Sequence, residues 1–188
     1  SQISMLLGDE REVEKLKKDL FRASLDNQEI AKAVEFERQS KYADAEKIYR
    51  KILTRHPDNV SAMRLWARLG LRQKQYRVAE IFLKRAVDLA PGFDQAWADL
   101  CEVQYEQEHF EDAMESATEL VKLQPRDPDG LLFLAASCAS AGKHSEALES
   151  YDRALEVAPG HVRALCGKGN LCRTIGDYEQ AVASFKRS

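Results

Sequence analysis

Hydrophobic positions recur along most of the chain at the spacing of one face of a helix. In one well-formed stretch, Leu131, Leu134, Ala135 and Cys138 stand at i, i+3, i+4 and i+7. A second stripe with the same spacing covers residues 147–155. The pattern predicts two helices of about 13 residues each, separated by a short turn.

Glycine, proline and aspartate mark where these helices stop and start. Gly142 and Gly176 stand in the turns that follow a first helix, where a left-handed residue is often needed. A proline follows the second helix and cannot continue it. Asp127 then precedes Pro128, which suits an N-cap followed by proline at the first helical position. The chain is therefore predicted to fold as helix-turn-helix hairpins.

The hairpins repeat with a fixed period. Four of the five prolines are 34 residues apart, at Pro57, Pro91, Pro125 and Pro159. This register divides the chain into the units 26–59, 60–93, 94–127, 128–161 and an incomplete 162–188.

Small and large residues occupy constant positions within each unit. The eighth residue is small throughout, as Ala33, Ala67, Cys101, Ala135 and Gly169. The twentieth is always alanine, at Ala45, Ala79, Ala113, Ala147 and Ala181. The seventeenth and twenty-fourth are mostly large, at Tyr42, Tyr76, Phe110, His144 and Tyr178, and at Tyr49, Leu83, Ala117, Tyr151 and Phe185. Small residues let two helices approach closely while large ones fill the space opposite, so each unit is predicted to be a closely packed helix pair.

Units of this length with these small, aromatic and proline positions resemble tetratricopeptide repeats. The resemblance covers residues 26–188, and the fourth unit matches it best. It implies an all-α fold, a right-handed α-solenoid of about five repeats whose first helices line a concave side.

The two ends of the chain depart from the repeat. Residues 9–25 begin with capping-box spacing and carry a narrow apolar stripe, so we expect a helix laid against the first repeat, with residues 1–8 as a tail. The fifth unit stops at Ser188 without a polar capping helix. We expect either a fragment of a longer protein or a cover over Tyr178, Ala181 and Phe185, for which end-to-end self-association is one route.

Composition narrows the class of protein. The 188 residues carry 28 basic and 31 acidic side chains, and a net charge of -3 argues against a dedicated nucleic-acid binder. No apolar run approaches the roughly 18–20 residues of a membrane helix, and no signal sequence begins the chain. The cysteines match no disulfide or zinc spacing, which favours free thiols in the cytoplasm; they are Cys101, Cys138, Cys166 and Cys172.

No pattern of catalytic or cofactor-binding residues emerges. The segment 160–169 faintly resembles a phosphate-binding loop, but six residues separate Gly160 from Gly167 and no Ser or Thr follows Lys168. We interpret its glycines as small residues at a helix crossing. Acidic pairs such as Glu106 and Glu108 flank a turn and are interpreted as solvated.

The histidines likewise match no metal-binding pattern. All four map to turns or unit ends, at His56, His109, His144 and His161. We therefore predict a protein that is not an enzyme, with no metal and no cofactor.

The concave side is where a ligand is expected. First-helix positions two, five, nine and twelve point there, and from them we select as partner-binding residues Arg64, Arg68, Gln95, Ala98, Glu102, Tyr105, Leu132, Ala136, Arg163 and Asn170. The resemblance also implies a known binding mode, in which repeats of this family bind the C-terminal carboxylate of a chaperone. We do not expect it here, because Asp99 and Asp129 would repel that carboxylate.

Charge is divided unevenly between units. The second unit nets +5 and the third -8. Two explanations stay open: the units complement one another where they stack, or the groove binds a partner of mixed charge.

Two functional hypotheses follow. The first is an interaction scaffold that binds a peptide, a helix or another domain in its concave groove. The second is a regulatory or substrate-presenting N-terminal part of a larger enzyme, because residues 171–186 resemble the last repeats of bacterial proteins that carry a sulfotransferase-type domain. The repeats do not identify the partner.

Overall fold

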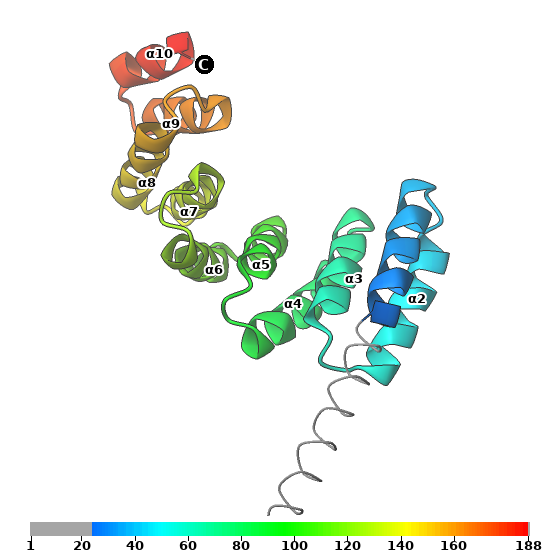
Figure 1. Ribbon diagram of the computed structural model, residues 1–188. Helices are drawn as coiled ribbons and strands as arrows, with labels where there is room; N and C mark the ends of the chain where they lie inside the picture. The colour runs from blue at the N-terminus through cyan, green and yellow to red at the C-terminus, as the bar shows by residue number, and fades with distance from the viewer. Residues whose placement is uncertain (1–23, 188) are drawn as a thin grey trace, which may run out of the picture.

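The computed structural model describes residues 24–187, and all regular structure within that range is α-helical (Figure 1). A first helix over residues 24–38 is followed by α2 (Tyr42–Arg55), α3 (Val60–Arg72), α4 (Tyr76–Leu89), α5 (Asp94–Glu106), α6 (Phe110–Leu123), α7 (Pro128–Ser140), α8 (His144–Val157), α9 (Val162–Thr174) and α10 (Tyr178–Arg187). The helix expected over residues 9–25 lies outside the described residues, except for its last two positions.

The helices recur with the predicted period. The even-numbered helices begin at residues 42, 76, 110, 144 and 178, and α3, α5, α7 and α9 begin at 60, 94, 128 and 162. Both series advance by 34 residues, which confirms the predicted α-solenoid.

The odd-numbered helices lie on the inner side of the curved array. Helix α3 contacts α5, α5 contacts α7, and α7 contacts α9, whereas successive even-numbered helices make no comparable contacts in the described chain. Figure 1 shows the even-numbered helices on the outer side of the curve. The concave groove is therefore lined by the helices to which the family resemblance assigned it.

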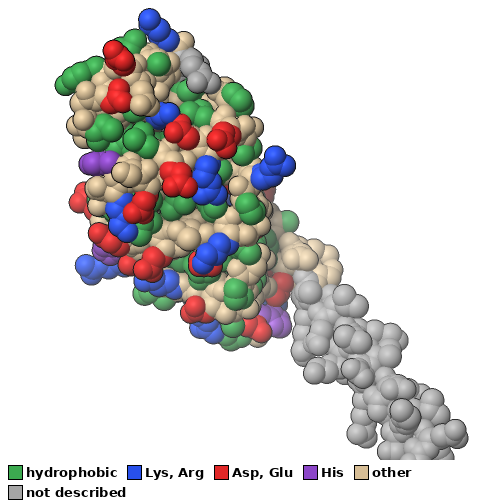
Figure 2. Space-filling view, turned by 90° about the vertical axis from the view of Figure 1, so that its left-hand side faces the viewer, with side chains coloured by type: hydrophobic (Ala, Val, Ile, Leu, Met, Phe, Trp, Pro, Cys, Tyr) green, Lys and Arg blue, Asp and Glu red, His purple; other side chains and the backbone are tan. Residues whose placement is uncertain are grey.

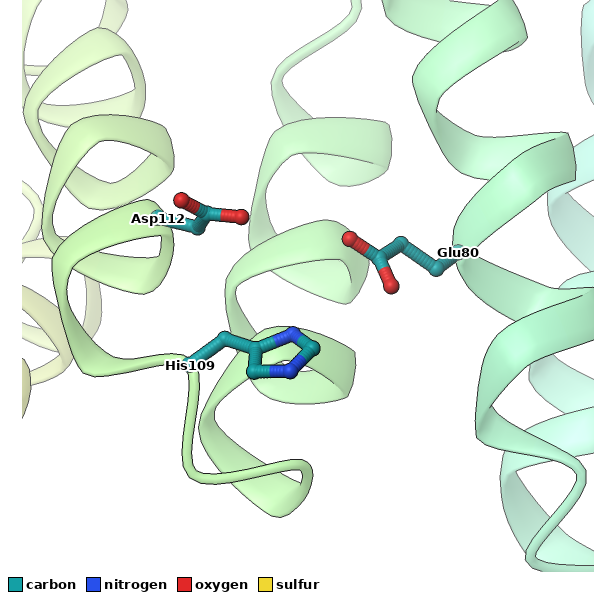
Figure 3. Close-up of side chains that lie close together, drawn as sticks. All are labelled: Glu80, His109 and Asp112. Carbon is teal, nitrogen blue, oxygen red and sulfur yellow. The ribbon is translucent and has the colours of Figure 1, made fainter.

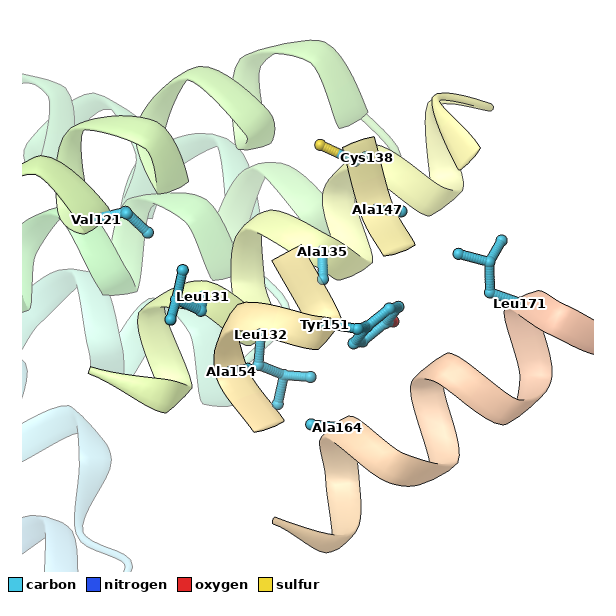
Figure 4. Close-up of a cluster of buried hydrophobic side chains, with 10 residues drawn as sticks. All are labelled: Val121, Leu131, Leu132, Ala135, Cys138, Ala147, Tyr151, Ala154, Ala164 and Leu171. Atoms are coloured by element: carbon cyan, nitrogen blue, oxygen red, sulfur yellow. The ribbon is translucent and has the colours of Figure 1, made fainter. Parts of the chain in front are cut away.

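The small positions hold the array together. All five alanines at position twenty are at most 3% exposed, which confirms that they lie at helix crossings. In the fourth repeat Tyr151 of α8 packs in one cluster with Ala135, Ala147 and Leu171 (Figure 4). Burying such a large side chain contributes roughly 1.5–3 kcal/mol, and these contacts join consecutive repeats.

Each hairpin turn contains one left-handed residue at the same place in the repeat. Gly142 (φ 77°) and Gly176 (φ 86°) supply it in the last two repeats, as predicted. Ser40, Lys74 and Glu108 supply it in the first three, with φ between 58° and 62°. The turn geometry is thus imposed by the helix pair, since non-glycine residues adopt it at an energetic cost.

Candidate functional site

The predicted groove residues divide by exposure. Five side chains are exposed on the inner helices, those of Arg68, Gln95, Glu102, Arg163 and Asn170. Ala98, Tyr105 and Ala136 are half-buried, and the Tyr105 hydroxyl lies 3.0 Å from the hydroxyl of Ser140. The remaining two, Arg64 and Leu132, differ from the prediction.

Leu132 was wrongly placed in the groove. It is 7% exposed and belongs to the core cluster that includes Tyr151 and Ala164 (Figure 4). Position five lies at the edge of the inner helix, where α7 contacts α9. An apolar side chain at that edge is covered by the next repeat and is not available to a ligand.

Arg64 is also wrongly predicted as an exposed groove residue. Its side chain is 15% exposed, and its Nε donates to Asp99 Oδ2 at 2.5 Å. Its Nη1 donates to Gln95, so one guanidinium joins α3 to two residues of α5. Arg64 therefore serves inter-repeat packing, and the opposite charges of the second and third units are in part complementary at their junction.

Burial controls the electrostatics of this junction. Burial raises the pKa of the Asp99 carboxyl, and the nearby Arg64 and Arg68 guanidinium groups oppose that rise. Arg68 lies farther away, with its Nε 3.9 Å from Asp99 Oδ1, and its side chain is 46% exposed. Arg68 thus remains accessible from the groove, whereas Arg64 does not.

The accessible groove carries both signs of charge on three different helices. Arg68 is on α3, Glu102 on α5 and Arg163 on α9. The pKa of Glu102 is raised, first by burial and then by the neighbouring Asp99, and the charges of Arg68 and Arg163 oppose this rise. Arg163 also lies 3.6 Å from Asp129, in an exposed pair. These side chains can contact a polar ligand, because their ion pairs within the protein are exposed and contribute little to stability.

A second arrangement, outside the groove, was missed by the sequence analysis. Glu80 of α4, His109 just before α6, and Asp112 of α6 each offer one ligand atom, and these atoms lie within 4.8 Å of one another (Figure 3). Spacing along the sequence gives no signal for this cluster, because its members come from two repeats and meet only through helix packing.

The cluster already holds a cationic group. Glu80 accepts from Lys84 Nζ and from Gln107 Nε2, both at 2.8 Å. Burial alone would raise the pKa of Glu80, but these two hydrogen bonds and the charges of Lys84 and His109 together outweigh it, and the pKa is lowered. A divalent cation bound by Glu80, His109 and Asp112 would compete with the Lys84 ammonium.

Two of the three glycines in the loop-like segment 160–169 serve packing. A Cβ added at Gly167 would lie 2.6 Å from the Tyr151 ring, and one added at Gly169 would lie 2.8 Å from Phe185. Both are in α9, so the interpretation of small residues at a helix crossing is confirmed for these two glycines. Gly160 precedes α9, and a Cβ added there would meet no atom within 4 Å.

Most of the cysteine side chains belong to the buried core. All four are free, and three are buried. Burial raises the pKa of the Cys101 thiol to about 12, which keeps it protonated and unreactive at neutral pH.

Surface charge is mixed outside the groove as well. Figure 2, which views the side that lies at the left of Figure 1, shows acidic and basic side chains interspersed with hydrophobic ones. Within the described residues no helix is long and apolar enough to cross a membrane.

Known proteins with similar sequences match this chain over only part of their own length. The peroxisomal targeting signal receptor of Candida albicans is 32% identical over 109 residues, which is 56% of this chain and 18% of the receptor. A TPR repeat-containing protein of Rhizobium etli is 22% identical over 100 residues, which is 53% of this chain and 49% of that protein. The chain thus spans at most half the length of these relatives.

Among solved structures, YrrB shares the fold with a TM-score of 0.74 at 19% identity, covering 85% of this chain and 82% of that one. YrrB is described as a TPR protein with an unusual peptide-binding site. Two family models described as tetratricopeptide repeat match residues 30–92 and 100–156, and residues 129–188. The 34-residue period, the small residues at constant positions and the helix pairs all agree with these matches. The chain therefore belongs to the tetratricopeptide repeat family.

Proposed function

We propose that this chain is an interaction module that binds an extended segment of a partner protein along its concave groove. The observation that carries the proposal is the exposed set of Arg68, Glu102 and Arg163, which spans three inner helices without being consumed by packing. The similar Candida protein is named a receptor for a targeting signal, and YrrB is described as having an unusual peptide-binding site, which supports a peptide ligand.

The groove favours a ligand of mixed charge. Arg68 and Arg163 suit carboxylates of the partner, and Glu102 between them suits a lysine or arginine. A clamp on a terminal carboxylate through Arg64 is disfavoured, because its guanidinium is bound to Asp99 and Gln95. An internal segment with alternating charges fits this surface better than a chain end does.

The test is charge reversal in the groove. Peptides selected from a displayed library would be titrated by fluorescence anisotropy against the parent and the double variant Arg68→Glu, Arg163→Glu. We expect an affinity about tenfold lower and a weaker dependence on salt. The free energy of unfolding should change by less than about 0.5 kcal/mol, since both residues are exposed.

The double variant Arg77→Glu, Arg85→Glu is the matched control, because both residues are exposed on α4, on the outer side of the array. Equal losses for the control and the groove variant would show that the peptide responds only to net charge. That result would contradict binding in the groove.

A face of α10 also supports association between two copies of the chain. At position twenty-four the side chain is buried in the earlier repeats, as in Tyr151 at 4%, whereas Phe185 is 41% exposed. Tyr178 and Val182 on the same helix are 68% and 51% exposed. Covering this apolar face would recover about 25 cal/mol per Å² of apolar surface, and we propose end-to-end pairing as the means.

A further inference from the structure

A cleft opens on the outer side of the array, away from the concave groove. Helices α4 and α6 form its walls and α5 forms its floor, and its volume is about 580 Å³. Because α5 belongs to the inner row of helices, the cleft faces outward between the second and third repeats. A volume of this size lies within the range typical of ligand sites, roughly 300–1,000 Å³.

Part of the cleft lining is apolar and includes a partly exposed tryptophan. Val87, Leu100 and Met114 contribute to the lining together with Trp97. Trp97 occupies the fourth position of its repeat, where the equivalent residues of the second, fourth and fifth repeats are each 1% exposed; these are Met63, Leu131 and Leu165. Trp97 is only half-buried. A residue at an otherwise core position thus packs against the core cluster around Leu100 and remains partly exposed.

Trp97 is held in place without the help of a ligand. Its indole Nε1 donates to the carbonyl oxygen of Pro91 at 2.8 Å. This hydrogen bond satisfies the only polar atom of the side chain, so the ring requires no further polar partner. A fixed aromatic ring in a cleft is a suitable surface for a cation.

The rim of the cleft is acidic. Asp88, Asp112, Glu115 and Glu119 line it, and Lys84 is the one basic residue among the lining residues described. The hydrogen bond from Lys84 to Glu80 raises the pKa of Lys84, so this ammonium is charged but already engaged. Glu119 pairs with Lys122 at 2.6 Å, whereas Asp88 and Glu115 have no ion pair within residues 24–186.

The corresponding cleft between α8 and α10 is smaller and less acidic. It measures about 360 Å³, and Lys168 pairs across it with Asp152 at 2.5 Å. Leu165 stands where the other cleft has Trp97. The α8–α10 cleft is thus lined by two carboxylates, Asp152 and Glu156, against four in the α4–α6 cleft, and tryptophan is absent from its described lining.

We propose that the α4–α6 cleft is a second binding site that accepts a basic peptide segment, with one lysine or arginine side chain over Trp97. The carboxylates of Asp88, Asp112 and Glu115 would contact that cation and a neighbouring basic residue. An apolar residue of the segment would cover Leu100 and Met114. Charge complementarity favours this occupant over an acidic or neutral segment.

The site can be tested with a defined probe, the acetylated and amidated peptide Gly-Lys-Leu-Arg-Gly. In a Trp66→Phe background Trp97 is the remaining tryptophan of the chain. We expect its fluorescence to change saturably with this peptide and the affinity to fall steeply with salt. The counterpart peptide Gly-Glu-Leu-Asp-Gly should produce no change.

Two residues at the same repeat position provide the matched variants. Glu115 lines the cleft, and Glu149 is its exposed equivalent 34 residues later on α8, outside the α4–α6 cleft. By isothermal titration calorimetry, Glu115→Lys should lower the affinity about tenfold, and Glu149→Lys should change it less than about twofold. Trp97→Leu, which restores an aliphatic residue at position four, should weaken binding while the protein remains folded by circular dichroism.

Three results would overturn the proposal. Trp97 fluorescence could fail to respond to millimolar peptide, or Glu115→Lys and Glu149→Lys could lower the affinity equally. The groove reversal Arg68→Glu, Arg163→Glu could also alter binding of this basic peptide as much as Glu115→Lys does, which would place the peptide elsewhere. Because the groove and the cleft are tested with separate variants, loss of one site leaves the evidence for the other intact.

Discussion

Arg64 and Arg68 show how one residue type serves two purposes four positions apart on the same helix. Both belong to the basic second repeat and both face Asp99. The nearer guanidinium is enclosed between α3 and α5, where it compensates a buried carboxylate. The farther one keeps nearly half of its side chain exposed. Distance to the partner and burial therefore decide which arginine stabilises the array and which can contact a ligand.

Arg64→Gln should destabilise the protein in a pH-dependent way. The pKa of Asp99 in the folded state is already above its ordinary value of 3.8, and removal of Arg64 raises it further. A carboxyl whose folded pKa exceeds its unfolded pKa costs stability as the pH rises from 3.8 through the folded pKa. The cost of the substitution should thus be small at pH 3.5 and reach about 2 kcal/mol at pH 7.

Urea unfolding of the parent and the variant at the two pH values measures this difference. Arg68→Gln is the control, because its more exposed side chain lies 3.9 Å from Asp99 and its loss should cost less than about 1 kcal/mol. An Arg64→Gln penalty of equal size at pH 3.5 and pH 7 would contradict the electrostatic role of Arg64.

At the scale of helices, the apolar period predicts almost all of the described fold. Small residues at positions eight and twenty indicated where helices cross, and every residue at these two positions is buried in the structure. Sequence reasoning did not find the left-handed residues Ser40, Lys74 and Glu108, because local preference favours glycine there and the helix pair overrides it. The positions of the helices can be predicted from nearby residues in the sequence. The left-handed turn residue cannot, because it is required by the packing of the two helices against each other.

The functional surfaces were harder to predict for the same reason. Leu132 and Arg64 stand at groove positions in the register, yet the next repeat covers them. The α4–α6 cleft and the cluster around His109 combine residues from adjacent repeats. Their proximity depends on the spacing between helices, which a periodic pattern does not report.

Gly167→Ala tests the crossing of α8 and α9. Alanine stabilises an exposed helix by about 1 kcal/mol relative to glycine. Here the added Cβ would lie 2.6 Å from the ring of Tyr151, which is 4% exposed and has little room to move. We expect overpacking to prevail, with a net destabilisation of about 1–3 kcal/mol in thermal or urea unfolding.

Gly160→Ala serves as the control for this substitution, because a Cβ at Gly160 meets no atom within 4 Å. Its effect should stay within about 0.5 kcal/mol. Stabilisation by Gly167→Ala would show that Tyr151 can shift at low cost, and the interpretation of Gly167 as a required small residue would then be wrong.

At the scale of the whole molecule, the array presents three surfaces of different character. The inner side offers Arg68, Glu102 and Arg163 as dispersed charges of both signs. The outer α4–α6 cleft combines a half-buried indole with carboxylates. The face of α10 exposes the apolar side chains of Tyr178 and Val182. All repeats use the same positions for packing, so the differences between the three surfaces come from residues that packing does not constrain.

Association through α10 is best tested at Val182. Phe185 packs on Gly169, so Phe185→Lys would also disturb the contact between α9 and α10. Val182 is 51% exposed on the same helix, and Val182→Lys should convert any dimer to monomer in sedimentation velocity while the helices stay folded. Hydrogen exchange of residues 178–187 should then become faster, because the covering copy is lost.

Ile81→Lys is the control, since Ile81 is 67% exposed on α4, and it should leave the association unchanged. A parent protein that stays monomeric at high concentration, with α10 protected as well as α7 and α8, would show that the apolar face needs no cover and would contradict end-to-end pairing.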